Sequence, residues 1–162
     1  MSIKKILWLE DQYEDFSAFR GALFRAGFMV DPVESVSEAE EKLRQEGDYI
    51  AYIFDIKVLP GDDKKWRDFD ERRRAENPDF DPYLGLELLK SLFNRQNKDG
   101  VKLAPPVVIK ASKVIVFSVV YDKSEEIHEI GVPEDQILYK AACDLSTLPQ
   151  LIKQIVEKVD GQ

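Results

Sequence analysis

The sequence lacks several features that define large classes of proteins. It has a single cysteine, Cys143, which excludes an internal disulfide and suits a reducing compartment. Its longest apolar runs, residues 49–54 and 114–117, fall far short of the ~20 residues that cross a bilayer. The four apolar residues before Glu10 are too few for a signal peptide. We therefore expect a soluble, cytoplasmic protein with no membrane association.

An excess of basic charge is also missing. The 23 lysines and arginines are outnumbered by 31 acidic residues, which gives a net charge of −8 and argues against nucleic-acid binding. Of the 162 residues, 44% are hydrophobic, too many for a disordered chain and enough to bury one core. The sequence therefore predicts a single acidic domain over residues 1–162.

The sequence instead contains an alternation of short β-rich runs with amphipathic segments. Strands are predicted at residues 6–9, 29–33, 49–54, 114–118 and 136–139, and helices at 13–25, 37–45, 84–93, 125–130 and 147–158. Ser37 and Glu40 have the spacing of a capping box for the second helix, and Pro32 favours an edge position for the second strand. Continuously apolar runs are typical of strands covered on both faces. Five strand–helix units with right-handed crossovers predict an α/β fold with a doubly wound parallel sheet.

Polar side chains follow four of the five predicted strands. Glu10 and Asp11 follow the first strand, Asp55 the third, Ser118 ends the fourth and Lys140 follows the fifth. Because the ligand site of such a sheet lies beyond the carboxyl ends of its strands, we expect these side chains to converge. Three crowded carboxylates repel one another, and bound Mg²⁺ would neutralise them. An aspartate beside such an ion can attack phosphorus, while a lysine and a hydroxyl stabilise the transferring group.

The chain resembles the response-regulator receiver domains of two-component signalling. The resemblance rests on ILWLED (6–11), YIFDIKVLPG (52–61), GLELLKSL (85–92), VIVFS (114–118) and ILYK (137–140). It implies a flavodoxin-like, five-stranded parallel sheet in the order 2-1-3-4-5 with helices on both faces. It also implies a signalling receiver rather than an enzyme in the usual sense.

The resemblance implies a role for each residue at the strand ends. Asp11 would bind Mg²⁺ directly, Glu10 would hold it largely through water, and Asp55 and the backbone carbonyl of Lys57 would complete the protein ligands. Asp55 would be the phosphoacceptor, and Lys140 would pair with its phosphoryl group.

The resemblance further implies a switch and two kinds of partner. Ser118 would move to bond the phosphoryl group, and that movement would reshape a protein-binding surface. The phosphodonor would be a sensor histidine kinase or a phosphotransfer protein. Because no output domain follows residue 162 in the sequence, we expect a downstream protein target, with slow autodephosphorylation ending the signal.

Two departures from the receiver pattern leave other functions open. Ile137 stands where many receivers carry the switch aromatic, with Tyr139 as a partial substitute, and Val119 stands where a small residue is common. One alternative is therefore a pseudo-receiver, an interaction scaffold that does not switch. A phosphohydrolase of the haloacid-dehalogenase type is disfavoured, because Lys57 stands where that family has its second aspartate.

Two segments make the chain longer than a typical receiver. Residues 62–82, an insertion after the third strand, hold eight acidic and six basic side chains together with Trp66, Phe69 and Phe80. They are either a solvated, partly helical excursion or a docking element or lid, since mixed charge with aromatics suits a partner surface. Residues 95–112 are predicted to form an extended connection with a short strand at 107–109. The sole histidine, His128, is interpreted as a surface residue.

Overall fold

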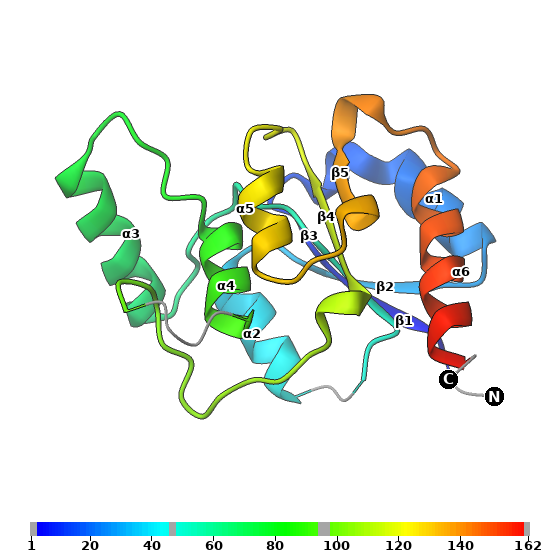
Figure 1. Ribbon diagram of the computed structural model, residues 1–162, viewed down its shortest axis with the longest axis horizontal. Coiled ribbons are helices and arrows are strands. Elements are labelled where there is room, and N and C mark those ends of the chain that lie inside the picture. Colours follow the sequence, from blue (N-terminus) through cyan, green and yellow to red (C-terminus); the bar gives the residue numbers. More distant parts are fainter. Residues whose placement is uncertain (1–2, 46–47, 94–97, 161–162) are drawn as a thin grey trace.

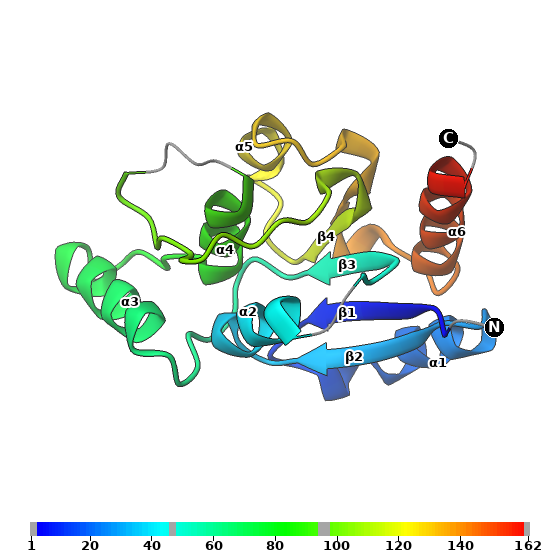
Figure 2. The same cartoon turned by 90° about the horizontal axis from the view of Figure 1, so that it is seen from below.

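A five-stranded parallel sheet forms the centre of the molecule (Figures 1 and 2). The computed structural model describes residues 3–45, 48–93 and 98–160. The strands run in the order β2-β1-β3-β4-β5 and every neighbouring pair is parallel. They are β1 (Lys5–Leu9), β2 (Met29–Val33), β3 (Ala51–Phe54), β4 (Val114–Ser118) and β5 (Ile137–Tyr139). The predicted α/β fold and its strand order 2-1-3-4-5 are confirmed, and Pro32 lies in an edge strand as expected.

Helices cover both faces of the sheet, as the continuously apolar strands predicted. In β1, Ile6 and Trp8 point into one core cluster with α1 and α6, and Leu7 and Leu9 point into the other with α2, α3, α4 and α5. The two groups of helices lie on opposite sides of the sheet in Figure 1. The helices are α1 (Ser17–Arg25), α2 (Val36–Gln45), α3 (Lys64–Glu76), α4 (Leu84–Phe93), α5 (Ser124–Glu129) and α6 (Thr147–Asp160).

Short 3₁₀ turns join several of these elements. One of them, Tyr13–Phe16, fills the first part of the helix predicted over residues 13–25, and the others are Ala111–Lys113, Glu134–Gln136 and Lys140–Ala142. None of the helices in the described part of the chain combines the length and the apolar character needed to span a bilayer.

The start of α2 differs from the prediction. The helix begins at Val36, and its capping residue is Ser35, whose Oγ accepts a hydrogen bond from Glu38 N–H (3.2 Å). The predicted cap, Ser37, lies inside the helix and donates instead to the carbonyl oxygen of Pro60. Ser35 with Glu38 and Ser37 with Glu40 both fit the capping-box pattern. Because Ser37 donates to Pro60, Ser35 is the residue that caps the helix.

The segment 62–82 contains α3, so it is partly helical as expected, but it is not wholly solvated, because two of its side chains are buried. Asp63 caps this helix by accepting a hydrogen bond from Lys65 N–H (3.0 Å). The idea that its aromatic residues form a partner surface is wrong for two of them, because Trp66 and Phe69 are 0% and 4% exposed and belong to the core. Phe80 is exposed and stacks edge-on against Tyr83.

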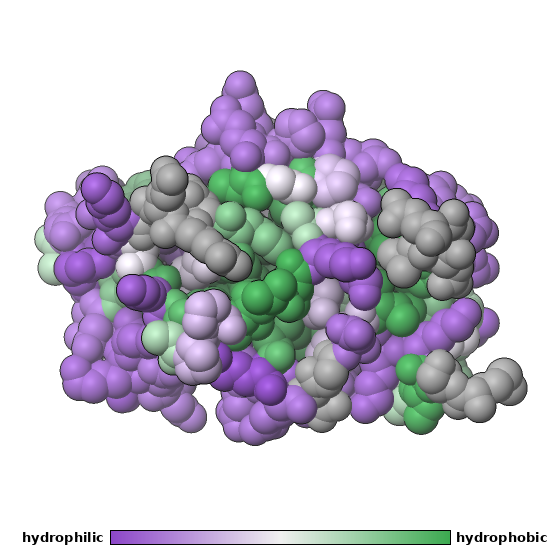
Figure 3. All heavy atoms as spheres, turned by 60° about the horizontal axis from the view of Figure 1, so that its bottom comes forward, coloured by the Kyte–Doolittle hydropathy of each residue, from purple (hydrophilic) through white to green (hydrophobic). Residues whose placement is uncertain are grey.

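The segment leading to β4 contains no strand within its described part, residues 98–112. The strand predicted at 107–109 is therefore wrong, and the start of the predicted connection, residues 95–97, lies outside the described residues. Val107 and Ile109 pack against the core as irregular chain, while Val108 is exposed. This segment runs along the lower edge of Figure 1, and Figure 3 shows apolar side chains gathered at the centre of the face seen from that side.

Candidate functional site

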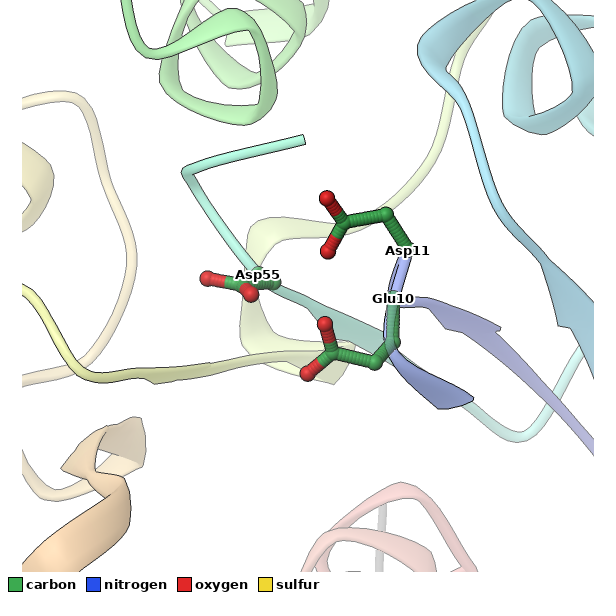
Figure 4. Close-up of side chains that lie close together, drawn as sticks. All are labelled: Glu10, Asp11 and Asp55. Carbon is green, nitrogen blue, oxygen red and sulfur yellow. The ribbon is translucent and has the colours of Figure 1, made fainter. Parts of the chain in front are cut away.

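Three carboxylates meet at the carboxyl end of the sheet (Figure 4). β1 and β3 are neighbours, with Leu9 opposite Phe54, so the residues that follow them, Glu10 and Asp55, lie side by side. Together with Asp11 they offer one oxygen each within 4.8 Å of one another. Glu10 is 0% exposed and Asp55 is 4% exposed, whereas Asp11 is partly exposed at the mouth of the site. Three close oxygen donors fit a hard divalent cation such as Mg²⁺.

Lys140 brings a positive charge to the same point. It follows β5, and its Nζ donates hydrogen bonds to Asp55 Oδ2 (3.0 Å) and to Glu10 Oε1. The ammonium also lies 4.4 Å from the ring centroid of Phe16 and 5.7 Å from that of Phe117, distances at which a cation is attracted to an aromatic face. The sequence therefore correctly predicted that Lys140 and the three carboxylates converge, although their roles stay predictions.

The crowding of negative charge alters the acidity of Glu10. Burial, and then the charge of Asp55, raise the pKa of the Glu10 carboxyl to about 8, although Lys140 acts in the opposite direction. The Glu10 carboxyl thus favours its protonated form at neutral pH despite the nearby ammonium, and a cation bound beside it would favour the ionised form.

Ser118 and Lys57 flank the carboxylates. Ser118 ends β4, which lies between β3 and β5; it is fully buried, and its Oγ accepts a hydrogen bond from Val120 N–H (3.1 Å). Lys57 N–H donates to Asp55 Oδ1 over 3.4 Å, and the Lys57 side chain is exposed. The movement of the Ser118 hydroxyl and the use of the Lys57 carbonyl as a metal ligand remain predictions.

One residue next to Asp55 was not identified from the sequence. Gly85, in the first turn of α4, donates its N–H to the carbonyl oxygen of Ile56 (3.0 Å). A Cβ at position 85 would lie 2.0 Å from the Asp55 carbonyl oxygen, so only glycine permits this approach of helix to strand end. The available signal was a glycine at the start of a helix, where glycine is unfavourable without a packing reason.

The contacts of His128, Cys143 and Tyr139 are with groups other than the carboxylates. His128 is exposed, and its Nδ1 is 2.9 Å from the carbonyl oxygen of Val132. Cys143 Sγ donates to the Tyr139 carbonyl oxygen at 3.3 Å. Ile137 is half-buried, and the 41% exposed ring of Tyr139 packs edge-on against that of Tyr121, with centroids 5.9 Å apart.

Comparison with known proteins adds to this geometry. No model of a protein family matches the sequence, and a search of curated proteins finds no match. A CheY-like receiver domain protein from Methanospirillum hungatei JF-1 is 17% identical, with a TM-score of 0.59 over 99% of this chain and 98% of its own. The receiver domain of Francisella response regulator 1452 is 15% identical, with a TM-score of 0.60 over 96% of this chain and 98% of its own.

A third solved structure, the phosphorylated cyanobacterial phytochrome response regulator RcpA, is 21% identical to this chain. It has a TM-score of 0.52 over 96% of this chain and 93% of its own. All three likenesses span nearly the whole length of both chains. The chain therefore has the fold of response-regulator receiver domains.

Proposed function

We propose that this chain is a receiver of a two-component phosphorelay that accepts a phosphoryl group on Asp55 in a Mg²⁺-dependent reaction. The observation that carries the proposal is the meeting of Glu10, Asp11, Asp55 and Lys140 at the carboxyl end of a receiver-type sheet. A charged residue at one strand end is commonplace, but buried carboxylates around a buried ammonium are costly to assemble without a chemical use.

Asp55 would act as the nucleophile. One of its carboxylate oxygens forms a bond to phosphorus while the phosphorus–nitrogen bond of a donor histidine breaks. The imidazole nitrogen keeps the electron pair of the broken bond and takes up a proton from water. Attack of water on the phosphorylated Asp55 later releases inorganic phosphate and restores the carboxylate.

Lys140 and Ser118 would stabilise the transferring group. The Lys140 ammonium already lies 3.0 Å from Asp55 Oδ2, so its positive charge is beside the oxygen atoms of a phosphoryl group carried there. The buried hydroxyl of Ser118, at the end of the neighbouring strand, would donate a hydrogen bond to one phosphoryl oxygen. Exchange of its present contact with Val120 for this bond would be the first step of the switch.

The residues present fit a Mg²⁺ ion. Glu10, Asp11, Asp55 and the backbone carbonyl of Lys57 would hold it, since they supply the oxygen ligands that this ion requires. When bound, Mg²⁺ would supply positive charge next to the transferring phosphoryl group.

The partners follow from this chemistry. The phosphodonor would be a sensor histidine kinase or a phosphotransfer protein, and the response would be altered affinity for a downstream protein in the cytoplasm. The capture of RcpA in its phosphorylated state supports this use of the fold. Phosphorylation would act as a signal rather than as turnover of a substrate, apart from slow autodephosphorylation.

A non-switching interaction scaffold is a second candidate, and one observation favours it. The aromatic residue of β5, Tyr139, packs against Tyr121 at the surface, and an aliphatic residue, Ile137, occupies the position two residues before it. A scaffold would keep the fold and the acidic site without responding to phosphodonors.

The test is intact-mass analysis after incubation with Mg²⁺ and a small acyl phosphate. We expect the wild type to gain one phosphoryl group and Asp55→Asn to gain none, while Asp62→Asn, which removes an exposed carboxylate from the same loop, labels like the wild type. Equal labelling of wild type and Asp55→Asn would mean that the acceptor is misassigned. No labelling of the wild type would support the scaffold.

A further inference from the structure

The inserted helix α3 is fastened to α2 through a buried carboxylate. Glu40, which is 5% exposed, accepts hydrogen bonds from Trp66 Nε1 (2.9 Å) and Lys65 Nζ (3.0 Å) of α3. Arg44, one turn further along α2, donates to it with Nε (3.0 Å) and Nη2 (2.9 Å). A carboxylate this buried, with four hydrogen bonds from three side chains, defines one arrangement of the two helices, because each donor must be in place to offset its desolvation.

The first turn of α3 is also tied to the chain that precedes it. Lys65 Nζ donates to Asp63 Oδ2 (2.8 Å) as well as to Glu40, and Asp63 Oδ1 accepts from Lys65 N–H. Asp63 N–H in turn donates to Ser37 Oγ (3.0 Å), and Ser37 Oγ donates to the Pro60 carbonyl oxygen. Lys65 therefore joins the loop before α3 to α2.

The same loop packs tightly against the start of α2. Val36 N–H donates to the Leu59 carbonyl oxygen (3.1 Å), and Leu59 forms a parallel bridge with Ser35. Gly61 has a φ of 81°, and a Cβ there would lie 2.4 Å from Ser35 Oγ. The backbone over residues 59–63 therefore has little room to move against the start of α2.

The loop formed by residues 59–63 lies close to the candidate site in the sequence. Only residues 56–58 separate it from Asp55, and Ile56 and Val58 are buried in the same cluster as Trp66. Lys57, between them, faces outward. Residues 56–58 are therefore held by the buried side chains of Ile56 and Val58 and by the chain on either side of them. A carbonyl in such a segment cannot shift without moving one of its anchors.

We propose that Lys65 and Glu40 are positioning residues for the Mg²⁺ site, acting through the loop that carries the Lys57 carbonyl. This inference rests on the proposed function, because it assigns a role toward the same ion. Binding and docking must then be coupled in both directions: α3 docked on Glu40 strengthens Mg²⁺ binding, and bound Mg²⁺ steadies α3. If α3 only stabilised the fold, its docking would not change Mg²⁺ binding, and Mg²⁺ would not change its docking.

The chain offers a matched pair of variants to test the coupling. Lys65→Gln removes the ammonium that joins Glu40 to Asp63, whereas Lys64→Gln removes the neighbouring ammonium, which is 81% exposed and contacts only the outward Asp68 among the described residues. Both variants lose one positive charge at nearly the same place, so long-range attraction or repulsion of the ion changes equally. Calorimetric titration with MgCl₂ measures the dissociation constant of the ion. The rate of hydrogen exchange of the α3 amides measures how firmly α3 is docked.

We expect Lys65→Gln to weaken Mg²⁺ binding by about fivefold or more, at the lower end of typical coupling between sites, and Lys64→Gln to match the wild type. Mg²⁺ should also slow hydrogen exchange in α3 of the wild type and do so less in Lys65→Gln. Equal dissociation constants for the two variants, with exchange in α3 indifferent to Mg²⁺, would overturn the inference while leaving the proposed function intact. A wild type that binds no Mg²⁺ would instead refute the proposed function and the inference with it.

Discussion

Replacement of Gly85 by alanine gives the most direct test of how the fold positions Asp55. The new Cβ would lie 2.0 Å from the Asp55 carbonyl oxygen and 2.7 Å from the Ile56 Cα. Because a carbon and an oxygen in contact lie about 3.3 Å apart, α4 and the end of β3 must separate by roughly 1.3 Å. Both groups are backbone, so no side-chain rotation can relieve the clash.

Two effects of opposite sign set the free energy of unfolding of Gly85→Ala. Overpacking costs about 1–3 kcal/mol, and the better helix propensity of alanine returns up to about 1 kcal/mol. We expect a net loss of about 1–2 kcal/mol, measured by urea unfolding. The rate of phosphorylation should be affected more strongly than stability, because a displacement of about 1 Å at a reacting group can slow a reaction on the order of a hundredfold.

Gly21→Ala is the matched control for this experiment. Gly21 lies in α1, and a Cβ there would meet only the mobile end of the Arg25 side chain, at 3.1 Å from Nη1. We expect it to unfold at equal or higher urea concentration and to gain a phosphoryl group at the wild-type rate, followed by intact mass over time. If Gly85→Ala behaved like Gly21→Ala in both assays, the reasoning from the close contact would be wrong.

Two further predictions concern single charged groups. Lys140→Ala should change the Mg²⁺ dissociation constant by less than about threefold, or roughly 0.7 kcal/mol. The same variant should abolish the change in hydrogen exchange that beryllofluoride causes in the wild type. A large loss of Mg²⁺ affinity in calorimetry would contradict the role given to Lys140. For Glu40, burial opposes ionisation, but hydrogen bonds from Lys65, Trp66 and Arg44 outweigh it and hold the pKa below its ordinary value of 4.5. Its stabilising contribution is therefore present above pH 4.5 and is lost as pH falls through the lower pKa of the folded state. Urea unfolding between pH 6 and pH 3 should show a smaller loss of stability in Glu40→Gln than in the wild type, and parallel curves would refute this account.

The arrangement of strands and the convergence at their ends could be predicted from the sequence. Continuous apolar runs such as residues 114–117 have one stable place, a strand buried on both faces, and parallel strands bring their carboxyl ends to one edge. The sequence alone therefore predicts that Asp55 and Lys140, 85 positions apart in the chain, meet.

The errors arise where local patterns are degenerate or depend on tertiary contacts. Ser35 and Ser37 both precede an acidic residue by three positions, and only the contact of Ser37 with Pro60 separates them. The β-branched residues at 107–109 suit a strand, but in the described structure they pack on the core without pairing with the sheet. The contact of Gly85 with Asp55 joins two elements whose separation no local pattern encodes.

Both free edges of the sheet are poor templates for an incoming strand. Met29 N–H donates inward to the Lys4 carbonyl oxygen, and because this direction alternates along β2, the nitrogen of Pro32 faces outward, where it has no hydrogen to offer. At the opposite edge, β5 provides only three residues. These two features disfavour the addition of a strand to the sheet, whether from a partner or from a second copy of the chain. Under the proposed function, a partner would then recognise side chains of this chain, and phosphorylation of Asp55 would alter the charge that they present.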